Sequence, residues 1–236
     1  MDCDWSTVGY ILPRSVKPSY FRNSIIWITG ASSGIGQALC YYLLSLKVGV
    51  KLVISSRRKN VLQKIKSDLL LKFKNSVYGT DIYVLPMDLT KKSIKYYRKQ
   101  YESIKDYFRI SSIDMLVNNA GIGMLSSFAK FEAQNSADML QTNLVSPIIL
   151  TKLVITDMIQ NNKNDSKNPF GHICNIGSVA AKISIPYQST YSATKAGLLS
   201  FGATIKQELE MYKNITITDV LPGMFLHFVF ICFCNQ

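Results

Sequence analysis

The sequence predicts an α/β protein with a doubly wound parallel sheet of about six strands and helices on both faces. Short apolar runs alternate with longer helical patterns along most of the chain, which is typical of such sheets. A glycine-rich turn joins the first apolar run to the first helical pattern. The 236 residues are 47% hydrophobic and 18% charged, so the chain is globular and has room for one sizeable core.

Strands are expected where β-branched and apolar residues cluster between turn residues, at 25–29, 51–55, 82–85, 113–118, 172–176 and 215–221. Apolar residues at helical spacing predict helices over 34–48, 59–74, 91–108, 132–162 and 189–212. Parallel strands joined through helices follow right-handed crossovers. The carboxyl ends of these strands therefore meet at one edge, where open parallel sheets bind ligands.

The net charge of +12 is concentrated in two stretches. Residues 47–74 hold nine basic residues and one acidic residue, and residues 91–109 hold seven and two. Solvated helix faces, attraction to a phosphorylated cofactor and attraction to an anionic membrane surface all fit this pattern. No nucleic-acid recognition motif accompanies the charge, so we expect no nucleic-acid partner.

The five cysteines are odd in number and irregularly spaced, which argues against a disulfide framework and indicates a reducing compartment such as the cytoplasm. No cysteine or histidine cluster has the spacing of a zinc site, so no metal is expected. Residues 1–24 resemble neither a signal peptide nor a membrane span.

The turn Thr29-Gly-Ala-Ser-Ser-Gly-Ile-Gly36 follows the first expected strand and opens the first long helix. Gly30 permits a sharp turn, Gly34 lets the backbone approach a pyrophosphate, and Gly36 permits close packing of helix on strand. The unpaired N–H groups at the helix start also favour phosphate. The alternative is a glycine-rich turn with no ligand.

The second expected strand ends in Ile54-Ser-Ser-Arg57-Arg58. Sheets that bind NAD usually carry an acidic residue here for the adenosine ribose hydroxyls, and this chain has none. Arg57, with Arg58 beside it, suits a 2′-phosphate instead. The pattern therefore favours NADP(H) over NAD(H), although an ordinary basic helix start would look the same.

Two polar groups follow the next strands. Asp88 comes just after the third strand, where its carboxylate can accept from an adenine amino group or cap the following helix. The segment Asn118-Asn-Ala-Gly121 ends the fourth strand at the same edge. Its small residues leave room for a flat ligand.

Asn143 stands in an otherwise apolar helical pattern, and a buried amide needs partners. It therefore braces the helix or orders a water molecule. Ser178 follows the fifth strand in Asn175-Ile-Gly-Ser178. Its hydroxyl can polarise a carbonyl or merely start a turn.

Tyr191 and Lys195 are four residues apart, which puts them on one face of a helix. A nearby ammonium favours the phenolate, so we expect the lysine to lower the tyrosine pKa from about 10. The pair is then a candidate proton donor and acceptor for a carbonyl or an alcohol. Taken alone, this spacing is common on helix surfaces.

In order and spacing, these motifs together resemble the short-chain dehydrogenase/reductase family over residues 25–223. The segment from Ala181 to Tyr191, with Ser56-Arg-Arg58, most resembles its membrane-associated "dehydrogenase/reductase member 7" group. The resemblance implies a Rossmann-like fold and hydride transfer between a nicotinamide and a carbonyl or secondary alcohol.

The resemblance also implies residue roles. Tyr191 would be the general acid/base, Lys195 would lower its pKa and bind the nicotinamide ribose, and Ser178 would hold the substrate oxygen. Asn143 would position a relay water. The implied cofactor contacts are Gly30, Ser32, Ser33, Gly34, Ile35, Gly36, Arg57, Arg58, Asp88, Leu89, Asn118, Ala120, Gly121, Tyr191, Lys195, Pro222 and Gly223.

The chain departs from the family pattern after Pro222-Gly223. We expect a loosely ordered lead over 1–24, an NADP-binding catalytic domain over 25–223 and a divergent apolar tail over 224–236. The tail follows too closely to form another parallel strand and can at best double back antiparallel. A tail packed on the sheet edge, a shallow membrane contact and a truncated product are open, and the pattern favours truncation.

The expected activity is that of an NADP(H)-dependent short-chain oxidoreductase acting on a small carbonyl or alcohol. The alternative is a catalytically weak or silent nucleotide-binding or interaction protein. Family members often form dimers or tetramers through the two long helices, here 132–162 and 189–212. The expected location is the cytoplasm, or a cytosolic or endoplasmic reticulum membrane surface.

Overall fold

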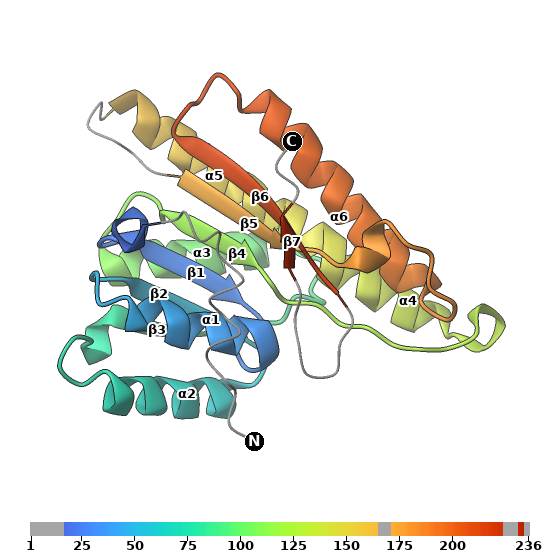
Figure 1. Cartoon of the computed structure of the whole chain (residues 1–236), viewed down its shortest axis with the longest axis horizontal. Helices are drawn as coiled ribbons and strands as arrows, with labels where there is room; N and C mark the ends of the chain where they lie inside the picture. Colours follow the sequence, from blue (N-terminus) through green and yellow to red (C-terminus); the bar gives the residue numbers. More distant parts are fainter. Residues whose placement is uncertain (1–16, 165–170, 224–230, 234–236) are drawn as a thin grey trace.

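A computed structural model describes residues 17–164, 171–223 and 231–233. It confirms the expected fold class: a parallel sheet lies between two layers of helices (Figure 1). The strand order is β3-β2-β1-β4-β5-β6-β7. The first six of these strands run parallel, and β7 runs antiparallel to β6.

The observed elements follow the expected ranges closely. The strands are β1 Ile25–Thr29, β2 Lys51–Ser56, β3 Ile82–Pro86, β4 Met115–Asn118, β5 Gly171–Ile176, β6 Ile215–Pro222 and β7 Ile231–Phe233. The long helices are α1 Gly34–Ser45, α2 Lys59–Lys72, α3 Ile94–Phe108, α4 Ala133–Leu140, α5 Ser146–Asn164 and α6 Ser189–Glu208. Alternation of apolar runs and helical periodicity was therefore sufficient to predict the order of the elements.

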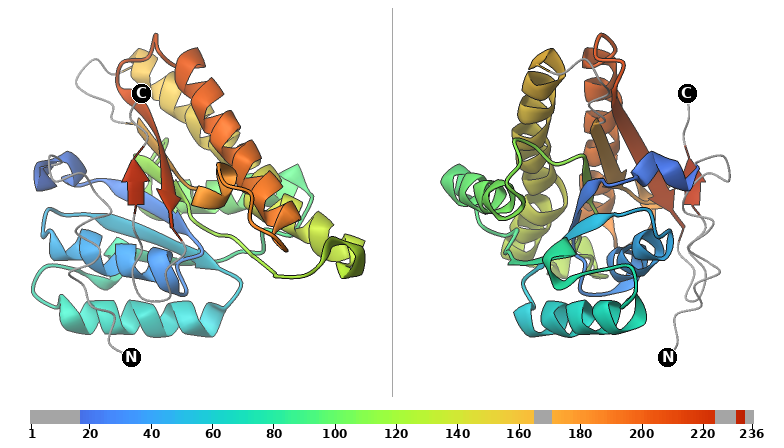
Figure 2. Two further views of the ribbon diagram at one scale, coloured as in Figure 1. Left: turned by 45° about the vertical axis from the view of Figure 1, so that its right-hand side comes forward. Right: turned by 90° about the vertical axis from the view of Figure 1, so that its left-hand side faces the viewer.

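Two apolar cores hold the layers together. On one face of the sheet, buried side chains of α1 and α2 pack against Ile26, Ile28 and Ile54. On the other face, α3 and α5 pack against Trp27 and Val53, and Leu209 joins them after α6. The right-hand view of Figure 2 shows the green and yellow helices α3 and α5 on the side of the sheet opposite the blue helix α1.

Some boundaries differ from the sequence prediction. Helix α3 begins at Ile94 rather than at 91, because the Ser93 side chain accepts a hydrogen bond from the Tyr96 N–H and caps the helix. Strand β4 begins at Met115 rather than at 113. The single helix expected over 132–162 contains a π-helical turn at Gln141–Val145, which separates α4 from α5.

Both ends of the described chain contain secondary structure, where the sequence predicted a loosely ordered lead and a divergent apolar tail. Residues Pro18–Phe21 form a short 3-10 helix, and the Phe21 side chain is buried in the first core. Strand β7 pairs antiparallel with β6, the one direction that the short connection was expected to allow. Residues 1–16, 224–230 and 234–236, which include most of the expected lead and tail, lie outside the described residues.

One helical stretch of the described chain, Ala133–Asn161, has the length and apolar composition of a membrane span. The buried side of α5 in this stretch packs on the sheet through Leu150 and Val154. Because the core helix of a globular protein passes the same test, the stretch is weak evidence for a membrane.

Candidate active site

Two adjoining cavities lie along the carboxyl edge of the parallel strands. The first has a volume of about 390 Å³ and the second about 460 Å³. Asn119, Gly121 and Ile122 line both of them, so the two cavities adjoin, and we call them together the groove. This is the edge at which the sequence predicted a ligand.

The glycine turn shapes the floor of the first cavity. Gly30 has φ +67°, and an added Cβ would lie 2.7 Å from the Ala120 Cα, so no side chain fits there. An added Cβ on Gly36 would lie 2.6 Å from the Gly30 carbonyl oxygen. At Gly34, with φ +56°, an added Cβ would meet nothing within 4 Å. The turn is therefore tightly packed at Gly30 and Gly36, and it is open at Gly34, where a phosphate would approach.

A hydrogen-bond hub joins the turn to the end of β4. The Thr29 hydroxyl donates to the Val117 carbonyl at 3.1 Å and accepts from the N–H groups of Asn119 and Ala120 at 3.0 and 3.1 Å. The Asn119 amide donates to the carbonyls of Thr29 and Gly30 at 2.8 and 3.2 Å. These bonds fix the two loops that border the first cavity.

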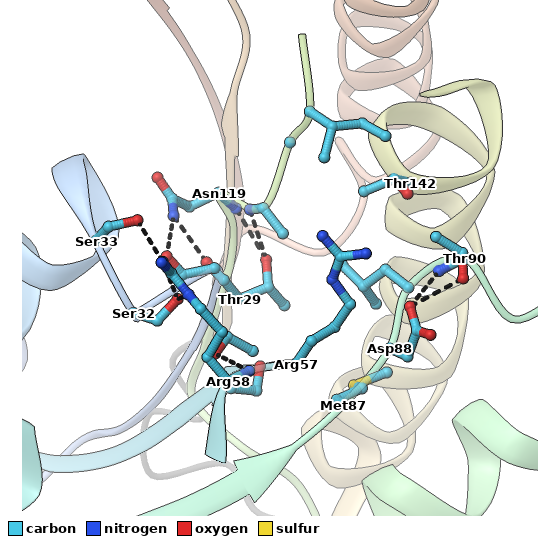
Figure 3. A pocket seen from close by; sticks show the side chains of 17 residues that line it. Thr29, Ser32, Ser33, Arg57, Arg58, Met87, Asp88, Thr90, Asn119 and Thr142 are labelled. Carbon is cyan, nitrogen blue, oxygen red and sulfur yellow. Dashed lines mark hydrogen bonds between the residues drawn. The ribbon is translucent and has the colours of Figure 1, made fainter. Parts of the chain in front are cut away.

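The two arginines after β2 have different roles in the structure (Figure 3). The Arg58 guanidinium donates to the Ser32 hydroxyl at 2.8 Å and to the Ser33 hydroxyl at 2.9 Å. It therefore braces the glycine turn. Arg57 lines the first cavity and is exposed, and its guanidinium extends into the space between the glycine turn and Asp88.

Asp88 and Leu89 line the opposite side of the first cavity. The Asp88 carboxylate accepts from the Thr90 N–H at 3.0 Å and from the Thr90 hydroxyl at 2.9 Å. Because Ser93 caps α3, the expectation that Asp88 caps this helix is wrong. Asp88 instead shapes a turn at the cavity wall, where a carboxylate oxygen can accept from a ligand.

The second cavity brings together three of the four expected catalytic residues, Ser178, Tyr191 and Lys195. Ser178 follows β5 and caps a 3-10 turn by accepting from the Ala180 N–H at 3.2 Å. Tyr191 and Lys195 lie on consecutive turns of α6. Ile35, Pro222 and Gly223, which the family resemblance implies as cofactor contacts, also line this cavity.

Lys195 is 3% exposed, and its ammonium donates to the Ile176 carbonyl at 2.7 Å. Burial lowers the pKa of Lys195 to about 8. The charge of this group is therefore lost at a lower pH than that of a surface lysine.

The Tyr191 phenol does not have the pKa direction that the sequence predicted. Burial raises the pKa of Tyr191 above its ordinary value, and the interaction with the Ser178 hydroxyl offsets only part of the rise. The Lys195 ammonium lies 5.7 Å from the centroid of the tyrosine ring and is engaged with Ile176. The cost of removing the phenolate from water therefore exceeds the expected help from the lysine.

Asn143 is fully buried in the π-helical turn and holds a loop rather than lining a cavity. Its amide oxygen accepts from the Ile122 N–H, and its amide nitrogen donates to the Ile122 carbonyl, both at 2.8 Å. The same nitrogen donates to the Thr194 hydroxyl at 3.2 Å. Asn143 thus ties the loop after β4 to the turn of α6 between Tyr191 and Lys195.

Three expected cofactor contacts line neither cavity: Gly34, Gly36 and Asn118. The Asn118 side chain is buried and donates to the Thr151 hydroxyl and the Asn175 amide oxygen, each at 2.9 Å. It lines neither cavity, because odd and even positions of a strand face opposite ways. The neighbouring Asn119 lines both cavities. The position of Asn119 directly after the strand was the signal in the sequence that could have identified it as a lining residue.

The sequence prediction also missed an apolar border of the second cavity. Met124 and Leu125 line this cavity and are 48% and 71% exposed. Nearby, the Ser126 N–H donates to the Tyr187 carbonyl at 3.2 Å and joins the loop after β4 to the segment before α6. No periodic pattern marks such loop residues, because their grouping depends on the fold.

Comparison with known proteins agrees with this geometry. The family model described as short chain dehydrogenase matches residues 24–229, and the chain belongs to this family. Its relatives include "Dehydrogenase/reductase SDR family member 7" of Mus musculus, 33% identical over 199 residues. That match covers 84% of this chain and 54% of the relative, so the chain spans about half of its length. Within the family, the chain groups with the member 7 proteins.

Two further matches concern cofactor and fold. An "NADP-dependent 3-hydroxy acid dehydrogenase" of Schizosaccharomyces pombe is 30% identical over 200 residues, which are 84% of this chain and 70% of the relative. The crystal structure of a metagenomic short-chain oxidoreductase in complex with NADP superposes with a TM-score of 0.74 at 24% identity. The superposition covers 87% of this chain and 85% of the metagenomic protein. It supports the Rossmann-like fold.

Proposed function

We propose that the protein is an NADP(H)-dependent oxidoreductase that interconverts a small carbonyl compound and the corresponding secondary alcohol. The observation that carries this proposal is the grouping of Ser178, Tyr191 and Lys195 in the second cavity, directly beside the glycine turn. A silent nucleotide-binding protein would not require these three groups in one cavity.

The residues of the first cavity fit a phosphorylated dinucleotide. Gly34 leaves open space at the start of α1, where backbone N–H groups favour phosphate. Arg57 is the cation that extends into this cavity, and it suits a 2′-phosphate. The name of the yeast relative agrees with NADP. Asp88 and Leu89 would hold the adenine side, and Lys195 would hold the nicotinamide ribose.

A bound nicotinamide supplies or accepts the hydride. Tyr191 donates a proton to the substrate oxygen during reduction and accepts it during oxidation. The raised pKa of Tyr191 keeps the phenol protonated at neutral pH, which suits the acid role. Ser178 holds the same oxygen by a hydrogen bond. Asn143 acts by position, because it holds both the Ile122 loop and the α6 turn in place.

The test uses Tyr191→Phe, which removes the phenol hydroxyl and keeps the ring. We expect the turnover of a carbonyl panel with NADPH to fall by at least about 100-fold, while the Kd for NADPH changes by less than about threefold. Fluorescence titration measures the Kd and absorbance at 340 nm measures turnover. Unchanged turnover in this variant removes the acid/base assignment.

Two proposals about partners follow from the family resemblance. Self-association through α5 and α6 would give a dimer or tetramer in size-exclusion chromatography with light scattering. Peripheral membrane contact of a cytoplasmic protein would appear as co-flotation with anionic vesicles. A monomer in the first experiment, or no flotation at low salt in the second, counts against the respective proposal.

A further inference from the structure

Five basic residues lie in, or within five positions of, two segments that line the first cavity, and we call them the cationic rim: Arg57, Lys59, Lys91, Lys92 and Lys95. All five side chains are exposed. Arg57 lines the cavity, and Lys59 begins α2 two residues later. The three other lysines follow the lining residue Thr90 within five positions. The two ends of the rim thus lie on two neighbouring segments of the carboxyl edge.

The charges of the cationic rim are not neutralised nearby. None of the five forms an ion pair with another described residue, and the ion pairs of Lys105 lie toward the other end of α3. The only carboxylate among the residues that line the first cavity is Asp88, and one of its oxygens is held by Thr90. The rim therefore contributes a net positive potential at the mouth of this cavity.

Helix stability does not explain this arrangement. Basic residues at the start of a helix oppose its macrodipole and so destabilise the helix. Lys59 and Lys95 stand at such positions, and neither α2 nor α3 has an acidic residue in its first turn. A sequence that breaks a local rule commonly does so for function.

We propose that the cationic rim steers phosphorylated dinucleotides into the first cavity and so accelerates their association. The inference rests on the proposed NADP(H)-dependent function and adds a kinetic role for surface residues outside the cavity. Charge of one sign around a cleft focuses the field and raises association rates by 10-fold or more. The field extends about 8–10 Å at ordinary ionic strength, so side chains near the mouth contribute without touching the ligand.

The expected signature is a difference between association and dissociation. A residue that touches the bound ligand changes mainly the dissociation rate, whereas a steering charge changes the association rate and its salt dependence. The effect is larger for NADPH than for NADH, because NADPH carries one more phosphate. A rim that serves only as a solvated helix face changes neither rate.

The experiment compares the full-length protein with the double variant Lys92→Gln/Lys95→Gln, which leaves every lining residue intact. The matched control is Lys47→Gln/Lys213→Gln, which removes the same charge from exposed positions next to the amino ends of β2 and β6. Rapid-mixing fluorescence measures the association and dissociation rates of NADPH and NADH at low and high salt. Thermal unfolding verifies that each variant is folded.

We expect the rim variant to slow NADPH association about three- to tenfold at low salt, with dissociation unchanged within twofold. The difference disappears at high salt, is smaller for NADH and is absent from the control. Equal association rates, a change confined to dissociation, or an equal loss in the control overturns the steering role. If the rim variant loses binding to anionic vesicles while its NADPH association rate is unchanged, the rim is a membrane-binding surface. That result also overturns the steering role. Failure of the wild-type protein to bind NADPH at equilibrium instead overturns the proposed function.

Discussion

Single side chains decide the chemistry of the groove, and neighbours with the same charge have different contacts. Arg58 is bound to two serines of the glycine turn, whereas Arg57 extends into the first cavity. The sequence favoured Arg57 for a 2′-phosphate and gave no sign that Arg58 braces the glycine turn. Their difference provides a matched pair for testing cofactor preference.

The first residue-scale prediction concerns that pair. Arg57→Gln should weaken NADPH binding about 10-fold or more and leave NADH binding nearly unchanged, because the proposed function assigns the lost charge to the 2′-phosphate. Arg58→Gln should weaken both cofactors to a similar extent, because it loosens the glycine turn. Kd values from fluorescence titration measure both effects. An unaltered NADPH/NADH ratio in the Arg57 variant excludes this contact.

The second residue-scale prediction concerns pH. The pKa of Lys195 is lowered to about 8, so its ammonium form is present below that pH and is lost above it. Carbonyl reduction should therefore fall as the pH rises through about 8. Lys195→Arg, if it turns over, should move this fall to a higher pH, since arginine stays charged. The pH profile of kcat/KM measures the shift, and an identical profile argues against a role for the Lys195 charge.

At the scale of elements, a row of polar side chains aligns three strands beneath the groove. The Asn118 amide donates to Asn175 and Thr151, and the Asn175 amide donates to the Asp219 carboxylate, each at 2.9 Å. Asn118 pairs with Asn175 and Asn175 with Asp219 in the register of β4, β5 and β6. The row thus stabilises the register in which these strands reach the edge of the sheet where the two cavities lie.

Asn175→Ala should destabilise the fold by about 2–4 kcal/mol, because it leaves Asn118 and Asp219 short of buried partners. Thr204→Ala, which removes an exposed hydroxyl bonded to the Ser200 carbonyl, should change stability by less than about 0.5 kcal/mol. Urea unfolding measures both. A similarly small loss of unfolding free energy in both variants would show that the row of polar side chains contributes little to stability.

At the scale of the whole molecule, the start of the described chain is hydrogen-bonded to strand β5. The His172 ring on β5 forms hydrogen bonds with the Thr218 hydroxyl at 2.9 Å and with the Tyr20 hydroxyl at 3.2 Å. Burial lowers the pKa of His172 to about 4. The folded state therefore holds this ring neutral, whereas the unfolded chain binds a proton near pH 6.5.

Stability should consequently decline as the pH falls from about 6.5 to 4, by up to about 3 kcal/mol from this group. Half-buried Asp114 and Asp219 have raised pKa values and act in the opposite direction at the acid end. Thermal unfolding across this range measures the decline. His172→Gln should flatten it, and a decline of the same steepness in that variant would assign it to other groups.

The sequence by itself determined the order of strands and helices, the edge at which the two cavities lie and many of the residues that line them. It did so because periodicity, glycine turns and strand ends are local properties, and a parallel sheet brings its carboxyl ends together. Only the tertiary structure decided that Arg58 braces the glycine turn, that Asn119 rather than Asn118 borders the cavity, and that burial raises the pKa of Tyr191. Those outcomes depend on contacts between distant segments and on exclusion of water, which no local pattern records.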